Sequence, residues 1–128
     1  MINLLLIAIG GAIGSILRYL TANGVYAMVS RDFPYGTLIV NVIGSGIMGF
    51  LTILILARFS DSSGHLRSLL LVGLMGGYTT FSAFSFETFY LFLNGHFLRA
   101  LLNILLSVAL CLLATWLGFI MAMRLSAI

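Results

Sequence analysis

The sequence predicts an all-α membrane protein with four transmembrane helices in each chain. The first observation is composition: 62% of the 128 residues are hydrophobic and only 7% are charged, which does not fit a soluble domain. The second is that apolar runs long enough to cross a bilayer alternate with short polar turns along the whole chain. This length leaves room for one domain, residues 1–128, whose apolar surface must face lipid and partner subunits.

The first two spans are rich in glycine. The first covers about residues 2–19 or a little more, and Arg18 lies near its far end. This span contains three glycines, Gly10, Gly11 and Gly14, which let another helix approach closely. A turn with the only proline, residues 30–36, leads to the second span, residues 37–57.

The third span, residues 66–93, follows a polar loop at residues 58–67 that includes Asp61 and Ser62. Its middle holds paired glycines and β-branched threonines, which are poor helix formers, so we expect this helix to be broken near mid-membrane. Lipid cannot satisfy the backbone groups that a break releases, so protein or a watery cavity must cover it. A glycine kink that only serves tight packing is the alternative. A turn at residues 94–96 precedes the fourth span, residues 97–123.

The positive charges are all arginines, and they are balanced across the predicted membrane. One side has Arg58, Arg67 and Arg124, and the other has Arg18, Arg31 and Arg99. The positive-inside rule therefore gives no orientation. A chain without charge bias can insert both ways up, so we expect two opposite copies to pair as an antiparallel homodimer. The alternative is that the loops simply carry few charges.

Polar side chains inside the spans are costly in hydrocarbon, so we expect them to face a partner or a pore. Asn41 can serve an anion with its amide N–H groups, or it can bond a neighbouring helix. Thr37 lies one turn earlier on the same face and lengthens a polar stripe, which favours a pathway. Asn103, Ser107 and Cys111 make a second stripe on the fourth span, where back-bonding to helix carbonyls is the alternative for Ser107.

Hydroxyls and aromatic rings follow the expected break. Phe81 and Phe84 lie three residues apart on one helix face, either as packing residues or as rings whose positive edges hold a small anion. Thr80 and Ser82 add hydroxyl groups beside them. Arg18 and Glu87 carry opposite charges near span ends, where they can snorkel, pair or line a vestibule.

The sequence argues against an enzyme. It has no Gly-rich phosphate loop beside a lysine, no histidine, cysteine and carboxylate cluster at metal-binding spacing, and no nucleophile with a base. The lone Cys111 excludes a disulfide within one chain, and His65 and His96 lie in expected loops. The net charge of +3 is too sparse for nucleic-acid binding.

Three motifs together resemble the Fluc (CrcB) fluoride channel family. They are Gly-Gly-x-x-Gly-x-x-x-Arg at residues 10–18, Gly-Thr-Leu-x-Val-Asn-x-x-Gly at residues 36–44 and Gly-Gly-x-Thr-Thr-Phe-Ser-x-Phe-Ser at residues 76–85. With the four spans and the balanced arginines, the resemblance covers essentially the whole chain.

This resemblance implies a fluoride-selective channel that exports cytoplasmic fluoride passively and confers fluoride resistance, from the bacterial inner membrane. It also implies an antiparallel dimer with two fluoride pathways along the subunit interface. The matching pathway residues are Asn41, Phe81, Phe84, Ser107, Thr37, Arg18, Glu87, Thr80 and Ser82. Backbone carbonyls of Gly76 and Thr79 match those that hold a central structural Na⁺. Asn103 departs from the family, because many relatives have tyrosine there.

Two other functions remain as alternatives. A small multidrug exporter also has four helices and dual topology, but proteins that resemble that family share a glutamate within the first helix. Here the only glutamate, Glu87, lies in the third span. A non-transporting assembly protein would use the glycines and Asn41 for packing alone.

Overall fold

Four long helical rods make up the computed structural model, which describes residues 1–59 and 63–126. The elements are α1 (Ile2–Met28), α2 (Tyr35–Arg58), α3 (Ser63–Leu66), the π-helix η1 (Arg67–Met75), α4 (Gly76–Tyr78), α5 (Phe81–Leu93) and α6 (Phe97–Ser126). Four segments are long and apolar enough to cross a membrane: Ile2–Met28, Tyr35–Arg58, Gly64–Leu93 and Phe97–Ser126. These spans confirm the predicted all-α membrane class. Asp61 and Ser62 of the predicted polar loop lie outside the described residues.

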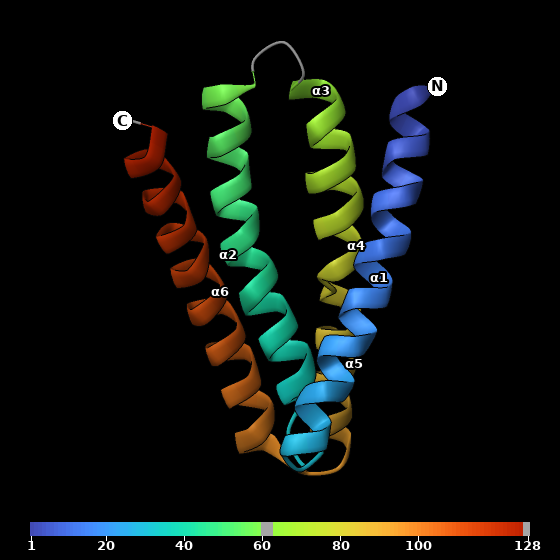
Figure 1. The fold of residues 1–128 in the computed structure, drawn as a ribbon. Helices are drawn as coiled ribbons and strands as arrows, with labels where there is room; N and C mark the ends of the chain where they lie inside the picture. Colours follow the sequence, from blue (N-terminus) through green and yellow to red (C-terminus); the bar gives the residue numbers. More distant parts are fainter. Residues whose placement is uncertain (60–62, 127–128) are drawn as a thin grey trace.

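The start of α1, the end of α2, the start of α3 and the end of α6 lie at the same end of the molecule (Figure 1). The opposite end holds the two other connections, residues 29–34 and residues 94–96. In the second of these, Gly95 has a φ of 76°, a conformation that favours glycine over other residues. The predicted turn there is confirmed. Arg58, Arg67 and Arg124 therefore lie towards one end and Arg31 and Arg99 towards the other, as the sequence predicts, whereas Arg18 lies within α1.

Two predicted boundaries are wrong. α1 continues past Tyr19 to Met28, so Arg18 lies in the interior of a long helix rather than near its far end. Asn23 and Gly24 look like a turn in the sequence, but single residues of this kind are tolerated within a helix. The third rod begins at Ser63 instead of residue 66, because Gly64 and His65 are helical, and the predicted polar loop is correspondingly shorter.

Glycine faces bring α1 against η1 and α4. A Cβ atom added at Gly10 would collide with the carbonyl oxygen of Leu69, and one added at Gly14 would collide with that of Leu74. On the other helix, a Cβ at Gly77 would lie 2.6 Å from the Gly11 carbonyl oxygen. Since no larger side chain fits, these glycines permit direct backbone contact between the two rods. The close approach predicted for the first span is confirmed.

Helical structure stops between α4 and α5. Thr79 has φ −80° and ψ 159°, and Thr80 has φ −152° and ψ 115°, so both are extended. Of the predicted poor helix formers, the two threonines are extended, whereas Gly76 and Gly77 remain helical, so the expectation is wrong for the glycines. Because Gly77 has no side chain, its backbone can contact α1 directly. The extended residues are the two threonines that follow.

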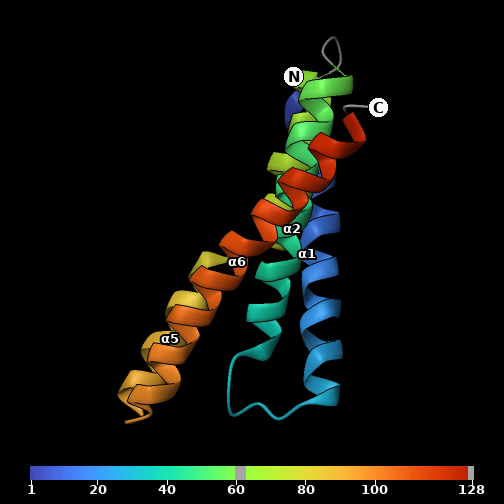
Figure 2. The ribbon, with the colours of Figure 1, turned by 90° about the vertical axis from the view of Figure 1, so that its left-hand side faces the viewer.

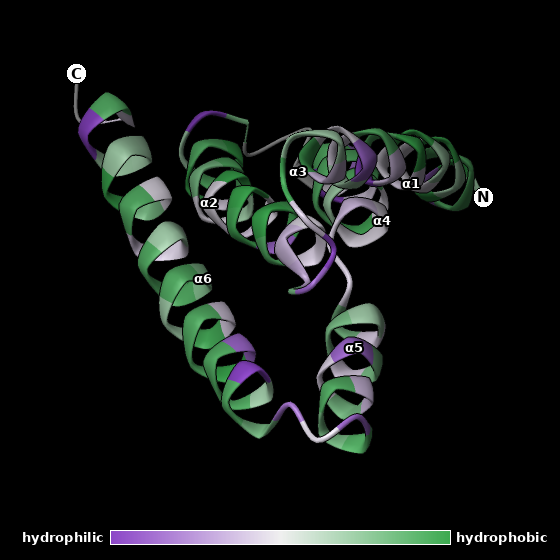
Figure 3. Cartoon of the chain, turned by 90° about the horizontal axis from the view of Figure 1, so that it is seen from below, coloured by the Kyte–Doolittle hydropathy of each residue, from purple (hydrophilic) through white to green (hydrophobic). Residues whose placement is uncertain are grey.

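A small buried cluster holds the centre of the fold. Val40 of α2, Met75 of η1 and Tyr78 of α4 pack together there. The Tyr78 hydroxyl donates to Thr21 Oγ1 of α1 at 3.3 Å, which links three rods. α5 and the first half of α6 diverge from α1 below this cluster (Figure 2). Seen from below, α5 is joined to α6 by the turn at residues 94–96 and stands apart from α1 (Figure 3).

Arginines bind both ends of the pair formed by α2 and α6. At one end, Arg99 Nη1 of α6 donates to the Asp32 carbonyl oxygen at 3.2 Å, just before α2 begins. At the other end, Arg58 Nη2 of α2 donates to the Leu125 carbonyl oxygen in the last turn of α6 at 2.6 Å. Two charged side chains thus satisfy backbone acceptors at opposite ends of the same helix pair.

Candidate functional site

Asn41 pairs with the extended backbone of Thr80. The Asn41 amide nitrogen donates to the Thr80 carbonyl oxygen at 3.0 Å, and the Thr80 backbone N–H donates to Asn41 Oδ1 at 2.8 Å. One side chain on α2 therefore satisfies both backbone groups of a residue that has left the helix. An asparagine amide has two N–H groups, so one remains for another acceptor after this pairing. Asn41 therefore bonds a neighbouring helix segment, which is one of the two roles that the sequence left open, and whether it also serves an anion stays a prediction.

The same pairing releases backbone carbonyls that a continuous helix would satisfy. The Thr80 N–H would then donate to the Gly76 carbonyl, but it donates to Asn41. The Ala83 N–H would serve the Thr79 carbonyl, but it donates to the Thr80 side-chain oxygen at 3.2 Å, because Thr80 caps α5. Gly76 and Thr79 thus present carbonyl oxygens without their helical donors. Carbonyl oxygens are ligands that a hard cation prefers.

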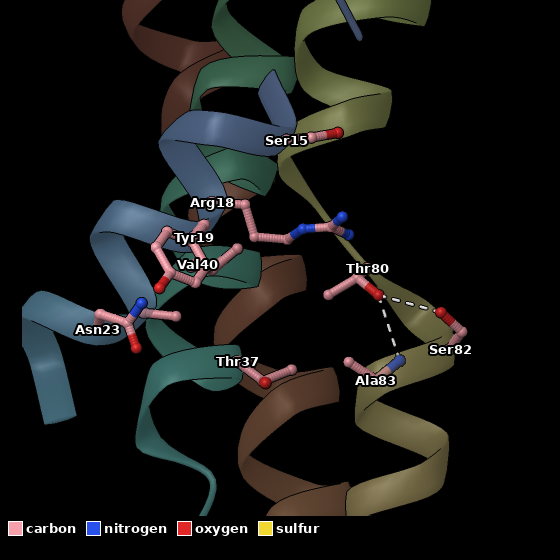
Figure 4. A pocket seen from close by; sticks show the side chains of 10 residues that line it. Ser15, Arg18, Tyr19, Asn23, Thr37, Val40, Thr80, Ser82 and Ala83 are labelled. Atoms are coloured by element: carbon pink, nitrogen blue, oxygen red, sulfur yellow. Dashed lines mark hydrogen bonds between the residues drawn. The ribbon is translucent and has the colours of Figure 1, made fainter. Parts of the chain in front are cut away.

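A cavity of about 680 Å³ lies between α1, α2 and the start of α5. Its polar lining comes from Ser15, Arg18, Asn23, Thr37, Thr80 and Ser82. Figure 4 shows the Arg18 side chain directed from α1 towards the extended segment at Thr80. The Thr80 hydroxyl also lies 3.2 Å from that of Ser82. This first cavity therefore combines one fixed positive charge with several hydroxyl groups.

A second cavity, of about 430 Å³, lies between α2, α5 and α6. Asn41, Phe81, Phe84 and Ser107 line it together, which places the predicted amide, rings and hydroxyl around one space. The rings of Phe81 and Phe84 are 5.4 Å apart between centroids and inclined by 45°. Phe81 is 79% exposed, so most of its ring is open to whatever covers this face. Thr80 lines both cavities, and it is the residue where they meet.

Glu87 lies apart from both of these cavities. It lines a third hollow of about 280 Å³ with Tyr26 and Arg31. Thr37, which is buried and faces the first cavity, donates to Glu87 Oε1 at 2.8 Å. Glu87 Oε2 is buried without a hydrogen-bond partner in the described part of the chain. Thr37 therefore connects the carboxylate to the first cavity, although Glu87 does not line it.

A buried polar chain that the sequence did not reveal runs behind the second cavity. Asn103 is 1% exposed, and its amide nitrogen donates to Thr88 Oγ1 at 2.8 Å. Thr88, which sequence reasoning missed, donates in turn to the Phe84 carbonyl oxygen at 2.7 Å. Its place four residues after Phe84 was a usable signal, since such residues share a helix face. Asn103 itself does not line the cavity, which explains how this position can differ from the family pattern.

The predicted site residues thus form two groups that share Thr80. Arg18, Thr37 and Ser82 belong to the first cavity, and the second contains the amide, the rings and Ser107. Cys111 lines the second cavity, one turn beyond Ser107. His65 and His96 are exposed and lie outside all three hollows. The arrangement places a charged, hydroxyl-lined hollow next to a second one that an amide, two aromatic rings and a hydroxyl line, and the two share Thr80.

Comparison with known proteins gives full-length matches. A family described as CrcB-like protein, Camphor Resistance (CrcB), matches residues 5–119. The chain is 50% identical over 125 residues to the fluoride-specific ion channel FluC of Methylococcus capsulatus, covering 98% of this chain but only 54% of that protein. It thus spans about half of that relative. The FluC protein of Coxiella burnetii is 51% identical over 123 residues, with 96% and 99% coverage. That of Geobacter sulfurreducens is 50% identical over 125 residues, with 98% and 100% coverage.

Proposed function

The chain belongs to the CrcB-like family, and on this basis we propose that it is a fluoride-specific ion channel of a bacterial inner membrane. Relatives about as long as this chain carry that name. The observation that carries the proposal is the second cavity, where an amide, two phenylalanine rings and a hydroxyl line one space. An ion channel needs no catalytic groups, which agrees with the absence of an enzyme motif from the sequence.

Fluoride is small and tightly hydrated, so a selective pore must replace water by close hydrogen-bond donors. The N–H that Asn41 has left after pairing with Thr80 is one donor, and the Ser107 hydroxyl is another. The edges of Phe81 and Phe84 add partial positive charge without the tight binding of a fixed cation. Chloride is larger and accepts weaker hydrogen bonds, so a narrow passage lined in this way excludes it.

The first cavity serves as the mouth of this pathway. Arg18 attracts anions to it, and the hydroxyls of Thr37 and Ser82 continue the polar lining towards Thr80. Glu87 holds Thr37 in place through their 2.8 Å hydrogen bond. The weak acid HF crosses the membrane neutral and dissociates inside, so the membrane potential alone drives the anion out. Passive export in this way confers resistance.

Two copies assemble as an antiparallel dimer with a pathway on each side. The balanced arginines support dual topology, and the exposure of Phe81, at 79%, supports a partner that covers this face. Each cavity is open in one chain, so a second copy completes its wall. Fusing two copies through an added odd membrane span should give an active channel, whereas a direct fusion that forces parallel copies should not. Equal activity of the two fusions would contradict this arrangement.

A structural sodium ion fits the extended segment. Gly76 and Thr79 carbonyls have lost their helical donors, and a two-fold axis beside them would bring together the same two carbonyls of each subunit. The ion would supply a fixed positive charge that satisfies these acceptors and links the subunits. Because backbone atoms form the site, the side chains of this segment do not choose the ion.

Fluoride efflux from liposomes that contain the purified protein tests the function directly. We expect fast fluoride efflux, measured with a fluoride electrode, and chloride efflux that stays close to protein-free liposomes. Comparable chloride flux would overturn fluoride selectivity. Proton-coupled uptake of cationic drugs in the same liposomes would instead support a multidrug exporter, although α1 has no acidic residue for that chemistry.

A further inference from the structure

We propose that Asn103 is a positioning residue that holds α6 against α5 through its hydrogen bond to Thr88. It thereby sets the distance between Ser107 and Phe84, which line two walls of the second cavity. This inference rests on the proposed function, because its effect is read as ion flux. Asn103 does not line the cavity, whereas Ser107 and Phe84 both do. It therefore acts on the pathway through its neighbours.

The hydrogen bonds form one directed chain. The single hydroxyl proton of Thr88 goes to the Phe84 carbonyl, so Thr88 can only accept from Asn103. This fixes the Asn103 amide with its nitrogen towards Thr88 and its oxygen towards Ser107. The Ser107 hydroxyl then donates to Asn103 Oδ1 over a long 3.5 Å. Of the three bonds, the one from Asn103 to Thr88 crosses from α6 to α5, and the other two each lie within one helix.

Burial makes this chain rigid. Asn103 is 1% exposed, Thr88 is 7% exposed and Ser107 is 8% exposed, so water cannot replace a lost partner. α5 diverges from α1 and is joined to α6 by a short turn (Figure 3). The Asn103–Thr88 bond is the side-chain hydrogen bond that links α5 to α6 in the described residues. It thereby sets how far Phe84 lies from the Ser107 helix.

The clamp has a consequence for the conducted ion. The Ser107 hydroxyl lies 3.5 Å from Asn103 Oδ1, beyond the usual O–H···O range, so it is held weakly and can turn to donate to an anion in the cavity. The bond it gives up is long and therefore weak, and the smallest halide offers the strongest replacement. A fixed wall and a weakly held proton together favour fluoride over chloride.

The Thr88→Val and Thr88→Ser variants test this inference in the full-length protein in liposomes. Valine keeps the shape of threonine but cannot accept from Asn103, whereas serine keeps the hydroxyl and loses the methyl group. If the Asn103–Thr88 bond positions the cavity walls, Thr88→Val lowers fluoride efflux by about threefold to tenfold, as expected for the loss of one net hydrogen bond. The same variant also raises the chloride-to-fluoride flux ratio. Thr88→Ser stays close to the parent. Pure packing predicts the reverse order, and that result would overturn the inference.

Asn103→Leu gives a second test of the same hydrogen bond, from its other partner. Its effect and that of Thr88→Val should not multiply in the double variant, because either change alone already breaks the bond. Multiplying effects would overturn the clamp, as would lower flux at an unchanged chloride-to-fluoride ratio. If Asn103→Leu fails to fold, the serine and valine pair still decides. A parent protein without fluoride flux would overturn the proposed function, whereas a conducting parent with a normal Thr88→Val would overturn this inference alone.

Discussion

Replacing Asn41 by leucine removes the pairing that holds the extended segment. Leucine has the same branched shape with larger end groups, but it can neither donate to the Thr80 carbonyl nor accept from the Thr80 N–H, which are bonded to Asn41 at 3.0 and 2.8 Å. Each backbone group left unpaired in a partly buried place costs about 1–3 kcal/mol. Because Thr80 caps α5, its carbonyl can still accept from the Phe84 N–H of the first helical turn, so the main loss is the unpaired Thr80 N–H, about 1–3 kcal/mol against the extended conformation.

The helix offers the Thr80 N–H another partner. If Thr80 returns to helical geometry, its N–H can donate to the Gly76 carbonyl, as in a continuous helix. A shift of about 2 kcal/mol changes such an equilibrium about thirtyfold. We therefore expect Asn41→Leu to close the junction of the two cavities at Thr80 and to lower fluoride efflux by about tenfold or more.

Ile55→Ala is the matched control for lost stability. Ile55 is 2% exposed and lines none of the cavities described above, and its truncation costs about 2–5 kcal/mol by the usual range for buried aliphatic residues. Both variants should therefore lower the midpoint of thermal unfolding in detergent, whereas only Asn41→Leu should lose efflux. Parent-like efflux in Asn41→Leu, or an equal loss in Ile55→Ala, would refute the reasoning.

Three further outcomes are expected. Phe81→Ile and Phe84→Ile should each cut fluoride efflux sharply while the protein still elutes as a dimer, and normal efflux in both would return the rings to a packing role. Gly14→Ala should lower the midpoint of thermal unfolding, because the added Cβ meets the backbone of η1. Gly24→Ala, which has nothing within 4 Å of the added Cβ, should raise stability by about 0.5–1 kcal/mol. Equal shifts of the two midpoints would contradict this reasoning. Replacing sodium by a larger cation should weaken the dimer or its efflux, and indifference to thorough sodium removal would count against the ion.

Much of the fold follows from residue types that act locally. Long apolar runs predict the spans, and the glycine spacing of the first span predicts its close contact with another helix. The length of α1 was not predictable in this way, because Asn23 and Gly24 resemble a turn. Their helical state depends on the apolar residues around them, which continue the span on both sides.

Residues of the site were predictable as types but not as partners. Asn41 and Ser107 stand out because polar groups in a span need a reason, and both line the second cavity. Thr88 escaped notice because a threonine within a helix commonly bonds its own backbone, as it does with the Phe84 carbonyl. Its second bond, to Asn103, depends on the register between α5 and α6, which no local pattern contains.

The position of the extended segment shows how a contact between distant residues can override local helix propensity. Local propensity places the interruption over the paired glycines and the two threonines that follow, yet Gly76 and Gly77 are helical and Gly77 packs against α1. The extended residues are Thr79 and Thr80, where a distant amide competes with the helix for the Thr80 N–H. Asn41 bonds the Thr80 N–H and the Thr80 carbonyl with one side chain, so the N–H has a partner although Thr80 is not helical. One α2 side chain thus fixes the extended segment, the junction of the cavities and the freed carbonyls together.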